Sequence, residues 1–437
     1  MLKYLSILGF DPAKHHVKTE MLAGLTTFLT MSYVLAVNPI VLSAAGMDKG
    51  AVFSATAIAA AVATLTMALY AKMPFALASG MGLNAFFAYT LVVSMGYTWE
   101  QALAAVLIEG VVFIVLTIFK VRQAIVDSIP LDLRYSISVG IGLFIAFIGL
   151  RNGGVLVSSD ATMTALGPWT ATSLIAICGI LLGSVLLILK IRGALFYTIL
   201  LMTVIGIPFG VTQLPDDFTL VSFPASVAPV AFHIDFSRFV MLDIDYIVVV
   251  MTLLFMDIFD TIGTLVGASI GGKLVDENGN VPNLNKALMA DAVGTTVGAL
   301  MGTSTVTTYV ESTTGIAEGG RTGLTSFTVA MLFLLALFFS PLFLIIPSAA
   351  TTSALFLVGV MMMRPVQKID FIHLSTGMPC FVTLMMMPFT ASISEGIVLG
   401  MLAYIMVKVC IGEGKSLSAV MYVLGALFLL KYIVPML

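Results

Sequence analysis

The chain has 437 residues, of which 59% are hydrophobic and only 10% charged, with a formal net charge of −3. Its mean hydropathy is +1.10. An ordinary soluble domain carries about 25% charged residues, so this composition excludes one and indicates a protein embedded in a lipid bilayer. The small net charge gives no reason to expect a nucleic-acid partner. The cysteines lie far apart without metal-ligand spacing, so we predict neither a disulfide framework nor a metal site.

The apolar sequence divides into stretches long enough to span the bilayer, which takes about 20 helical residues. The N-terminal residues lead straight into such a stretch and lack the cleavage site of a signal peptide. We predict about fourteen segments, because one of the last three stretches is a half-span or lies at the membrane surface. The stretches are 21–45, 50–70, 75–95, 98–119, 134–150, 170–189, 194–210, 244–267, 286–301, 303–320, 323–345, 349–363, 376–390, 394–411 and 418–435.

Lysine and arginine are unevenly distributed between the two ends of these segments. With a cytoplasmic N-terminus, 16 of the 20 Lys and Arg residues fall at cytoplasmic ends, and the exceptions are Lys49, Arg151, Arg238 and Lys431. Cytoplasmic loops of membrane proteins carry such an excess. The sequence therefore predicts a multi-pass protein of the cytoplasmic (inner) membrane with its N-terminus inside the cell.

Two segments contain stretches that disfavour a helix. Gly80 and Gly82 precede Asn84 in the third segment, and the run 304–310 before Glu311 in the tenth is rich in β-branched residues. An extended backbone at membrane depth must find its hydrogen bonds within the protein. We therefore expect the two stretches to pair as short antiparallel strands, each followed by a half-helix that starts near Asn84 or Glu311. Interrupted segments at matching places are typical of transporters built from inverted repeats.

Two aspartates lie inside the eighth segment, in the stretch LLFMDIFDTIGTLVG. Asp257 and Asp260 are three residues apart, so they share a helix face with Thr261 and Thr264. A charge at the bilayer centre costs at least about 2.5–3.5 kcal/mol. We therefore interpret at least one aspartate as functional, whereas the threonines fit simple hydrogen bonding between helices equally well.

Other polar residues inside segments have a functional and a structural interpretation. Glu311 is not followed by Lys or Arg until Arg321, and a carboxyl group held away from water readily carries a proton. Asn84 offers both a donor and an acceptor, or serves only as a helix N-cap. Glu109 and Asp291 are either internal hydrogen-bond anchors or functional groups.

The inventory of polar and aromatic side chains indicates the ligand. Carboxylates accept hydrogen bonds, so the ligand should present N–H groups or be a cation. The nearby rings, which suit a flat ligand, are those of Phe28, Phe86, Phe87 and Tyr309. An anionic ligand is disfavoured, because no Lys or Arg lies near the middle of these segments.

Motifs along nearly the whole chain resemble a known family. Resemblance to the adenine/guanine/hypoxanthine permeases, the AzgA-like branch of the nucleobase:cation symporters, is carried by GLTTFLTMSYVLAVNP, GMGLNAFFAYTLV, IGLFIAFIGLRNGG, MDIFDTIGTLVGAS and GTSTVTTYVESTTGIAEGGRTGLT. The resemblance implies a uracil-permease-like fold, an all-α polytopic membrane protein with about fourteen segments in a 7+7 inverted repeat. It also implies a core domain of residues 1–125 and 244–345 and a gate domain of residues 126–243 and 346–437.

The resemblance also assigns candidate site residues. In the family, the purine sits between the paired strands of the third and tenth segments, and the first and eighth segments line it. The matching or analogous positions in this chain are Thr27, Phe28, Asn84, Ala85, Asp257, Asp260, Val310 and Glu311. Ala85 and Val310 are expected to contribute backbone contacts, and Glu311 or Asp257 is expected to carry the coupled proton.

Residues and resemblance together predict a non-enzymatic secondary transporter that imports adenine, guanine or hypoxanthine by proton symport, without a cofactor. Na⁺ is the alternative coupling ion, and a homodimer is allowed. Transport of xanthine or uracil is the alternative within the class, and a purine receptor without transport lies outside it. An intramembrane aspartyl protease is disfavoured, because those enzymes place aspartates on two helices, one within a GxGD motif that this chain lacks.

Overall fold

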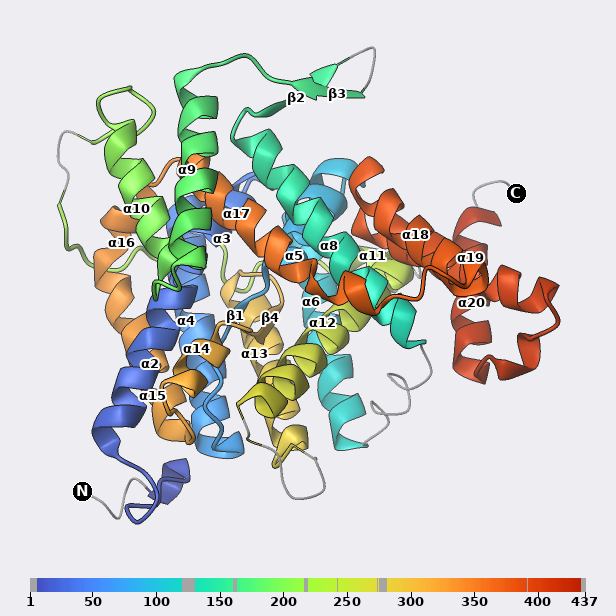
Figure 1. The fold of residues 1–437 in the computed structure, drawn as a ribbon, viewed down its shortest axis with the longest axis horizontal. Coiled ribbons are helices and arrows are strands. Elements are labelled where there is room, and N and C mark those ends of the chain that lie inside the picture. The colour runs from blue at the N-terminus through green and yellow to red at the C-terminus, as the bar shows by residue number, and fades with distance from the viewer. Residues whose placement is uncertain are drawn as a thin grey trace.

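The computed structural model describes residues 6–119, 130–159, 163–215, 219–241, 243–272, 274, 281–390 and 392–433. Helices dominate this part of the chain (Figure 1). Four cations that support the predicted orientation, and the predicted domain boundary at 125/126, lie outside the described residues. These cations are Lys3, Lys120, Arg122 and Lys273.

In the described part of the first half, the predicted segments contain nine helices and strands, and a further strand pair lies outside these segments. Its helices and strands are α2 (Val17–Met31), α3 (Val34–Ser43), α4 (Lys49–Thr66), β1 (Leu77–Ser79), α5 (Met81–Ala85), α6 (Trp99–Ile118), α8 (Leu131–Asn152), β2 (Leu156–Ser159), β3 (Met163–Leu166), α9 (Ala171–Ile188) and α10 (Ala194–Gly206). The π-helical turns η2 (Met67–Ala71) and η3 (Phe86–Ser94) extend α4 and α5.

The described residues of the second half contain one short strand among helices. Its elements are α11 (Ser237–Val240), α12 (Ile244–Gly271), α13 (Leu284–Met301), β4 (Val306–Thr308), α14 (Ser312–Ala317), α15 (Gly323–Ala336), α16 (Ser340–Leu344), α17 (Ser348–Met362), α18 (Leu374–Phe389), α19 (Ile393–Cys410) and α20 (Ala419–Ile433). Short 3₁₀ turns join several of these helices.

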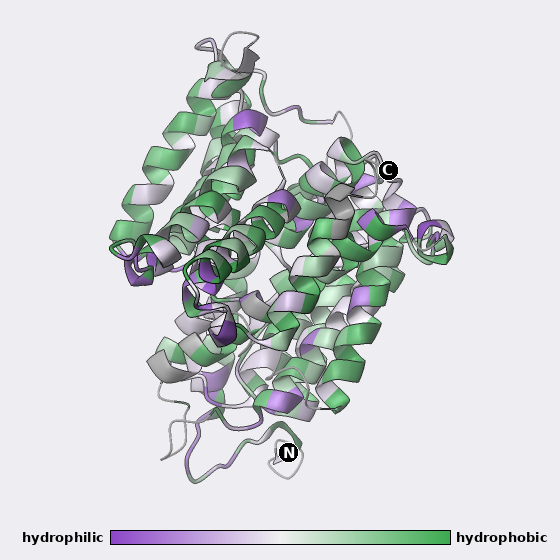
Figure 2. Ribbon diagram, turned by 90° about the vertical axis from the view of Figure 1, so that its right-hand side faces the viewer, coloured by the Kyte–Doolittle hydropathy of each residue, from purple (hydrophilic) through white to green (hydrophobic). Residues whose placement is uncertain are grey.

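The helices have the length and composition of membrane spans. Eight helices in the described part of the chain are long and apolar enough to cross a membrane, and three shorter ones are also apolar. Figure 2 shows hydrophobic residues along most of the helices. The predicted total of about fourteen segments is larger than eight and stays a prediction, as does the inverted repeat.

β1 and β4 pair with each other near the middle of the molecule (Figure 1). The pairing is antiparallel, with Leu77 opposite Thr308 and Ser79 opposite Val306. Each strand interrupts a segment that is otherwise helical, as expected from the glycines in one stretch and the β-branched residues in the other. The pair therefore joins two parts of the chain that lie more than 200 residues apart in sequence.

Side-chain hydroxyl groups complete the hydrogen bonding around this two-stranded sheet. Thr64 Oγ1 accepts from the Leu77 N–H at 3.0 Å and lies 3.1 Å from the Leu77 carbonyl oxygen, to which it donates. Thr295 Oγ1 donates to the Val306 carbonyl at 2.9 Å. Buried backbone polar groups are thus satisfied without water, as a membrane interior requires.

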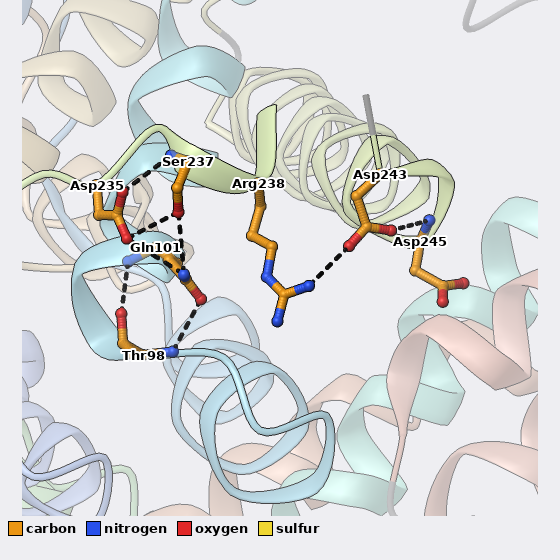
Figure 3. Close-up of polar contacts among 7 residues, drawn as sticks. All are labelled: Thr98, Gln101, Asp235, Ser237, Arg238, Asp243 and Asp245. Carbon is orange, nitrogen blue, oxygen red and sulfur yellow. Dashed lines mark hydrogen bonds and ion pairs between the residues drawn. The ribbon is translucent and has the colours of Figure 1, made fainter. Parts of the chain in front are cut away.

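The long polar loop before α12 is tied to the start of α6 (Figure 3). Gln101 donates through Nε2 to Asp235 and to Ser237, both at 3.2 Å. Backbone and side-chain hydrogen bonds from Ser237 hold the pKa of the Asp235 carboxyl below its ordinary value. Arg238 pairs with Asp243 at 3.4 Å. The loop is therefore held beside α6 just before α12 begins.

The helices pack in two groups that interleave along the chain (Figure 1). In the first group α13 lies against α4 and α6, and α15 lies against α2 and α4. In the second group α17 lies against α8 and α9, and α18 lies against α8 and α19. The predicted division into a core and a gate, and the motion of one against the other, stay predictions.

A contact between glycines allows α8 and α17 to cross closely, and a larger residue there should destabilise the folded protein. A Cβ on Gly359 would lie 2.5 Å from the Gly142 carbonyl oxygen and 2.8 Å from the Ala146 Cβ. We predict that Gly359→Val destabilises the folded protein by about 1–3 kcal/mol, because backbone atoms cannot move aside. Thermal unfolding of the detergent-purified protein measures the effect.

The control for this variant is Gly263→Ala, because a Cβ at Gly263 would meet nothing within 4 Å. We expect this control to unfold at or above the wild-type temperature, since alanine favours a helix more than glycine does. Equal unfolding temperatures for Gly359→Val and the wild type would contradict the tight crossing.

Candidate functional site

The β1–β4 pair ends beside polar side chains from three separate parts of the chain. Glu311 is the residue before α14. Tyr33, at the break between α2 and α3, donates its hydroxyl to Glu311 Oε1 at 2.8 Å. The Tyr33 and Tyr309 ring centroids are 6.5 Å apart, and Asp260 on α12 is close enough to Glu311 to interact with it electrostatically. Two carboxyl groups and two phenol groups therefore meet at this point.

Tyr309 fixes the turn that leads from β4 to Glu311. Its hydroxyl donates to the Ser79 carbonyl at 2.5 Å, and its N–H donates to the Ala76 carbonyl at 3.0 Å. Ala76 in turn donates its N–H to Ser312 Oγ at 3.0 Å. Since residues on both sides of Glu311 are bound to the β1 segment, the strand pair sets the position of the Glu311 carboxyl group.

The eight predicted site residues fall into an accessible set and a buried set. Val310 is 50% exposed, and the half-buried members are Phe28, Asp260 and Glu311. The buried members are Thr27, Asn84, Ala85 and Asp257. The accessible set is therefore partly open in this structure, whereas the buried set is enclosed by packing.

Asn84 lies inside its half-helix rather than at the start. The helix α5 begins at Met81 after an extended Gly80, so the prediction that the half-helix starts near Asn84 is wrong. Met81 and Leu83 are both buried in the main hydrophobic core, and this burial outweighs the low helix propensity of the glycines. Ser304 donates its hydroxyl to Asn84 Oδ1, so Asn84 connects the two interrupted segments.

Asp257 and Asp260 have different neighbours. Asp260 is hydrogen-bonded to Thr307 on β4 and lies near Glu311. Asp257 accepts from Thr261 Oγ1 at 3.3 Å and is within hydrogen-bonding reach of Glu109 on α6. Residues three apart on a helix differ in direction by about 60°, so the polar stripe expected from the sequence is divided between two environments.

Thr27 and Phe28 hold α2 against the site. A Cβ on Gly315 would lie 2.1 Å from Thr27 Oγ1, so the missing side chain at Gly315 lets α14 rest directly on α2. The Phe28 ring packs edge-on against Phe333, with centroids 5.2 Å apart. Thr27 therefore lies at the contact between α2 and the half-helix that follows Glu311, and the half-buried Phe28 packs on α15.

Tyr33 is the site residue that the sequence analysis did not single out. No motif marks it, because a tyrosine within an apolar segment usually packs in the core or lies at the membrane surface. Burial in the folded structure is what draws attention to it. Tyr33 is 2% exposed, and a buried tyrosine hydroxyl needs a hydrogen-bond partner. Only the folded structure shows that Glu311, 278 residues further along the chain, is that partner.

Comparison with known proteins gives relatives along almost the whole chain. The chain is 41% identical to the adenine permease AdeQ of Escherichia coli, over 95% of this chain and 93% of that protein. It is 38% identical to the guanine/hypoxanthine permease PbuG of Bacillus subtilis, over 97% of this chain and 98% of that protein. Both alignments include all eight predicted site residues within their extent along the chain.

Solved structures of transporters share the fold. The transmembrane domain of the cyanobacterium bicarbonate transporter BicA superposes with a TM-score of 0.64 at 17% identity, over 87% of this chain and 98% of that one. At an identity this low, the likeness shows only that the two proteins share a fold. The permease relatives and the eight apolar helices together show that this chain is a multi-pass membrane protein.

The family model described as the Permease family matches residues 18–399. The matched range includes both interrupted segments and every predicted site residue. The relatives at 38–41% identity confirm the resemblance that the sequence motifs indicated. This chain belongs to the Permease family.

Proposed function

We propose that this chain is a secondary transporter that imports purine nucleobases, namely adenine, guanine or hypoxanthine, across the cytoplasmic membrane by proton symport. The proposal is carried by the meeting of the half-buried Glu311 and Asp260 with the buried Tyr33 and Tyr309 at the end of the strand pair. The names of AdeQ and PbuG, an adenine permease and a guanine/hypoxanthine permease, support the choice of base.

The chemistry of the accessible set suits a neutral base with N–H groups. Carboxylate oxygens only accept hydrogen bonds, and the ring N–H and amino groups of purines only donate them. The ion pairs of the described residues lie elsewhere, and none includes Asp260 or Glu311. An anionic ligand would therefore meet two acidic groups without a compensating cation. The half-buried Phe28 ring offers a flat apolar surface beside them.

Each predicted residue has a role consistent with its position. Glu311 and Asp260 accept hydrogen bonds from the base, and Val310 offers its exposed backbone. The residues that brace the site from behind are Thr27, Asn84, Ala85 and Asp257. Asp257 or Glu311 carries the coupled proton, with Na⁺ as the alternative ion.

At the level of the whole chain, we propose about fourteen segments in a 7+7 inverted repeat. Core (1–125 and 244–345) and gate (126–243 and 346–437) then move against each other to expose the site to alternate sides of the membrane. The interleaved packing of two helix groups supports this division. The Lys and Arg distribution supports a cytoplasmic N-terminus in the inner membrane, and a homodimer is compatible with it.

Glu311→Gln tests the acceptor that is central to the site. The change removes a charged acceptor while retaining an oxygen for the Tyr33 hydroxyl. We expect purine affinity to fall by about 10- to 150-fold, because a hydrogen bond to a charged group contributes about 1.5–3 kcal/mol. Uptake of radiolabelled hypoxanthine by cells that lack other purine permeases measures the effect.

Glu413→Gln is the matched control, since Glu413 is 55% exposed and pairs with Lys408. We expect wild-type uptake from the control at equal protein levels. Uptake by Glu311→Gln that matches the wild type in rate, affinity and pH dependence would contradict the proposed role.

Asp260→Asn tests the second accessible carboxyl group. The amide oxygen can still accept from Thr307, but the amide group brings two donors that face the donors of a bound purine. We expect uptake to fall by about tenfold or more, with unchanged elution of the purified protein. Asp48→Asn keeps the cap on Ala51 N–H and is the control, and undiminished uptake by Asp260→Asn would exclude Asp260 from the site.

A competition series identifies the base. Unlabelled adenine, guanine, hypoxanthine, xanthine and uracil are each added in excess to wild-type cells taking up labelled hypoxanthine or adenine. We expect one or more of the first three bases to abolish uptake, because each presents N–H donors to the acidic pair. Stronger competition by xanthine or uracil would replace the proposed substrate with another nucleobase.

A further inference from the structure

A second group of acidic side chains lies behind the accessible site. Glu109 on α6 is fully buried, and its Oε2 accepts from Thr305 Oγ1 at 2.8 Å. Its other oxygen, Oε1, is buried and receives no hydrogen bond from any donor in the described ranges of the chain. The Glu109 carboxyl is within hydrogen-bonding reach of Asp257 on α12. Two carboxyl groups hydrogen-bond to each other only when a proton lies between them.

A third carboxyl group lies close to the pair. Asp291 on α13 accepts from Thr261 Oγ1 at 2.9 Å and from Thr308 Oγ1 at 3.1 Å. It is close enough to Glu109 to interact with it electrostatically. Three carboxyl groups from three helices therefore share this buried region.

Other ionisable side chains lie on the elements that pack around Glu109 and Asp257. Asp260 and Glu311 lie near the end of β4 with Tyr33 and Tyr309. The remaining ionisable side chains described on elements packed against α6 and α12 lie toward helix ends or, for Tyr89, accept a hydrogen bond from Asn152 Nδ2. They are Glu100, Asp132, Arg134, Tyr135, Arg151, Arg238, Asp245, Tyr246, Lys286, Glu395, Tyr404, Lys408 and Tyr422. In the described chain, no ion pair includes Glu109.

We propose that Glu109 and Asp257 together form the binding site of the coupled proton, with one proton held between their carboxyl groups. This inference rests on the proposed function, because it assigns the coupling ion of that transporter to two named side chains. The purine binds at Glu311 and Asp260, and the proton binds nearer the start of β4, where Thr305 donates to Glu109. One proton enters from water when the site faces outside, and the same proton leaves to water when the site faces the cytoplasm.

β4 connects the two binding events. Thr305, immediately before the strand, donates to Glu109, and Thr307 within it is bonded to Asp260. The strand then continues through Tyr309 to Glu311. Loss of the proton leaves two facing carboxylates that repel each other, and Thr305 is bonded to one of them. A shift of this strand therefore alters the purine-binding carboxyl groups, so proton and purine occupancy are coupled.

Glu109→Gln in reconstituted proteoliposomes tests the proposal. The glutamine retains an acceptor for Thr305 and donates to Asp257, so it imitates the protonated pair without a proton to release. We expect exchange of labelled for unlabelled hypoxanthine at equal pH to stay within about threefold of the wild type. Accumulation driven by a pH gradient should fall by about tenfold or more, and a vesicle-trapped pH dye should report no proton entry with the base.

Glu20→Gln is the matched control. Glu20 is also buried, but it accepts from the Arg321 and Thr322 N–H groups and from Thr325 Oγ1 at 2.5–3.3 Å, away from the pair. We expect this variant to keep proton-driven accumulation. The proposal is overturned by normal accumulation in Glu109→Gln, by loss of exchange and accumulation together in a folded variant, or by wild-type accumulation driven by Na⁺ alone. Absence of any nucleobase exchange in the wild type would instead overturn the proposed function, and with it this inference.

If the Glu109→Gln variant does not fold, a measurement on the wild-type protein still tests the proposal. Dicyclohexylcarbodiimide is apolar and reacts with protonated carboxyl groups inside membrane proteins. We expect mass spectrometry to find the adduct on Glu109 or Asp257 at pH 6, with parallel loss of proton-driven accumulation. Complete absence of the adduct from both residues in transport-competent protein would contradict a shared proton.

Discussion

The structure depends on the pairing of β1 with β4 inside a bundle of membrane-spanning helices. Water is not available there to satisfy extended backbone, and each unsatisfied polar group costs several kcal/mol. The strands satisfy each other through the register from Leu77–Thr308 to Ser79–Val306, and hydroxyl groups on neighbouring helices satisfy most of what remains. Because the strands come from different halves of the chain, their pairing also fixes the side chains that follow them. Glu311 and Asn84 owe their positions to this constraint.

Two acidic environments lie along the same strand pair, although the sequence places Asp257 and Asp260 on one helix. Asp260 lies near Glu311 and the tyrosines, and Asp257 lies near Glu109. Threonines in and just before β4 contact Glu109, Asp260 and Asp291, so a backbone segment of a few residues touches both environments. A change of charge in either environment therefore alters the hydrogen bonding of the strand, which gives a physical route for coupling between two ligands.

Local chemistry explains which features could be predicted from sequence. The run of β-branched residues before Glu311 and the glycines before Asn84 made a strand pair the economical solution for interrupted segments. Burial was harder to foresee: α5 starts at Met81 because Met81 and Leu83 pack in the core. Tyr33 was missed because its partner is 278 residues away, and no local pattern carries that information.

Glu109 shows most clearly why a buried site cannot be recognised from the sequence alone. In the sequence it is a lone acid in VLIEGVV, equally consistent with a structural anchor. Its neighbour Gly110 lets α6 approach α13, since a Cβ there would lie 2.8 Å from Thr296 Oγ1 and 3.0 Å from its backbone nitrogen. That close approach brings the Glu109 carboxyl to Asp257 on a third helix. A proton-binding pair can therefore arise from two acids that are separately unremarkable, through a glycine that only tertiary packing explains.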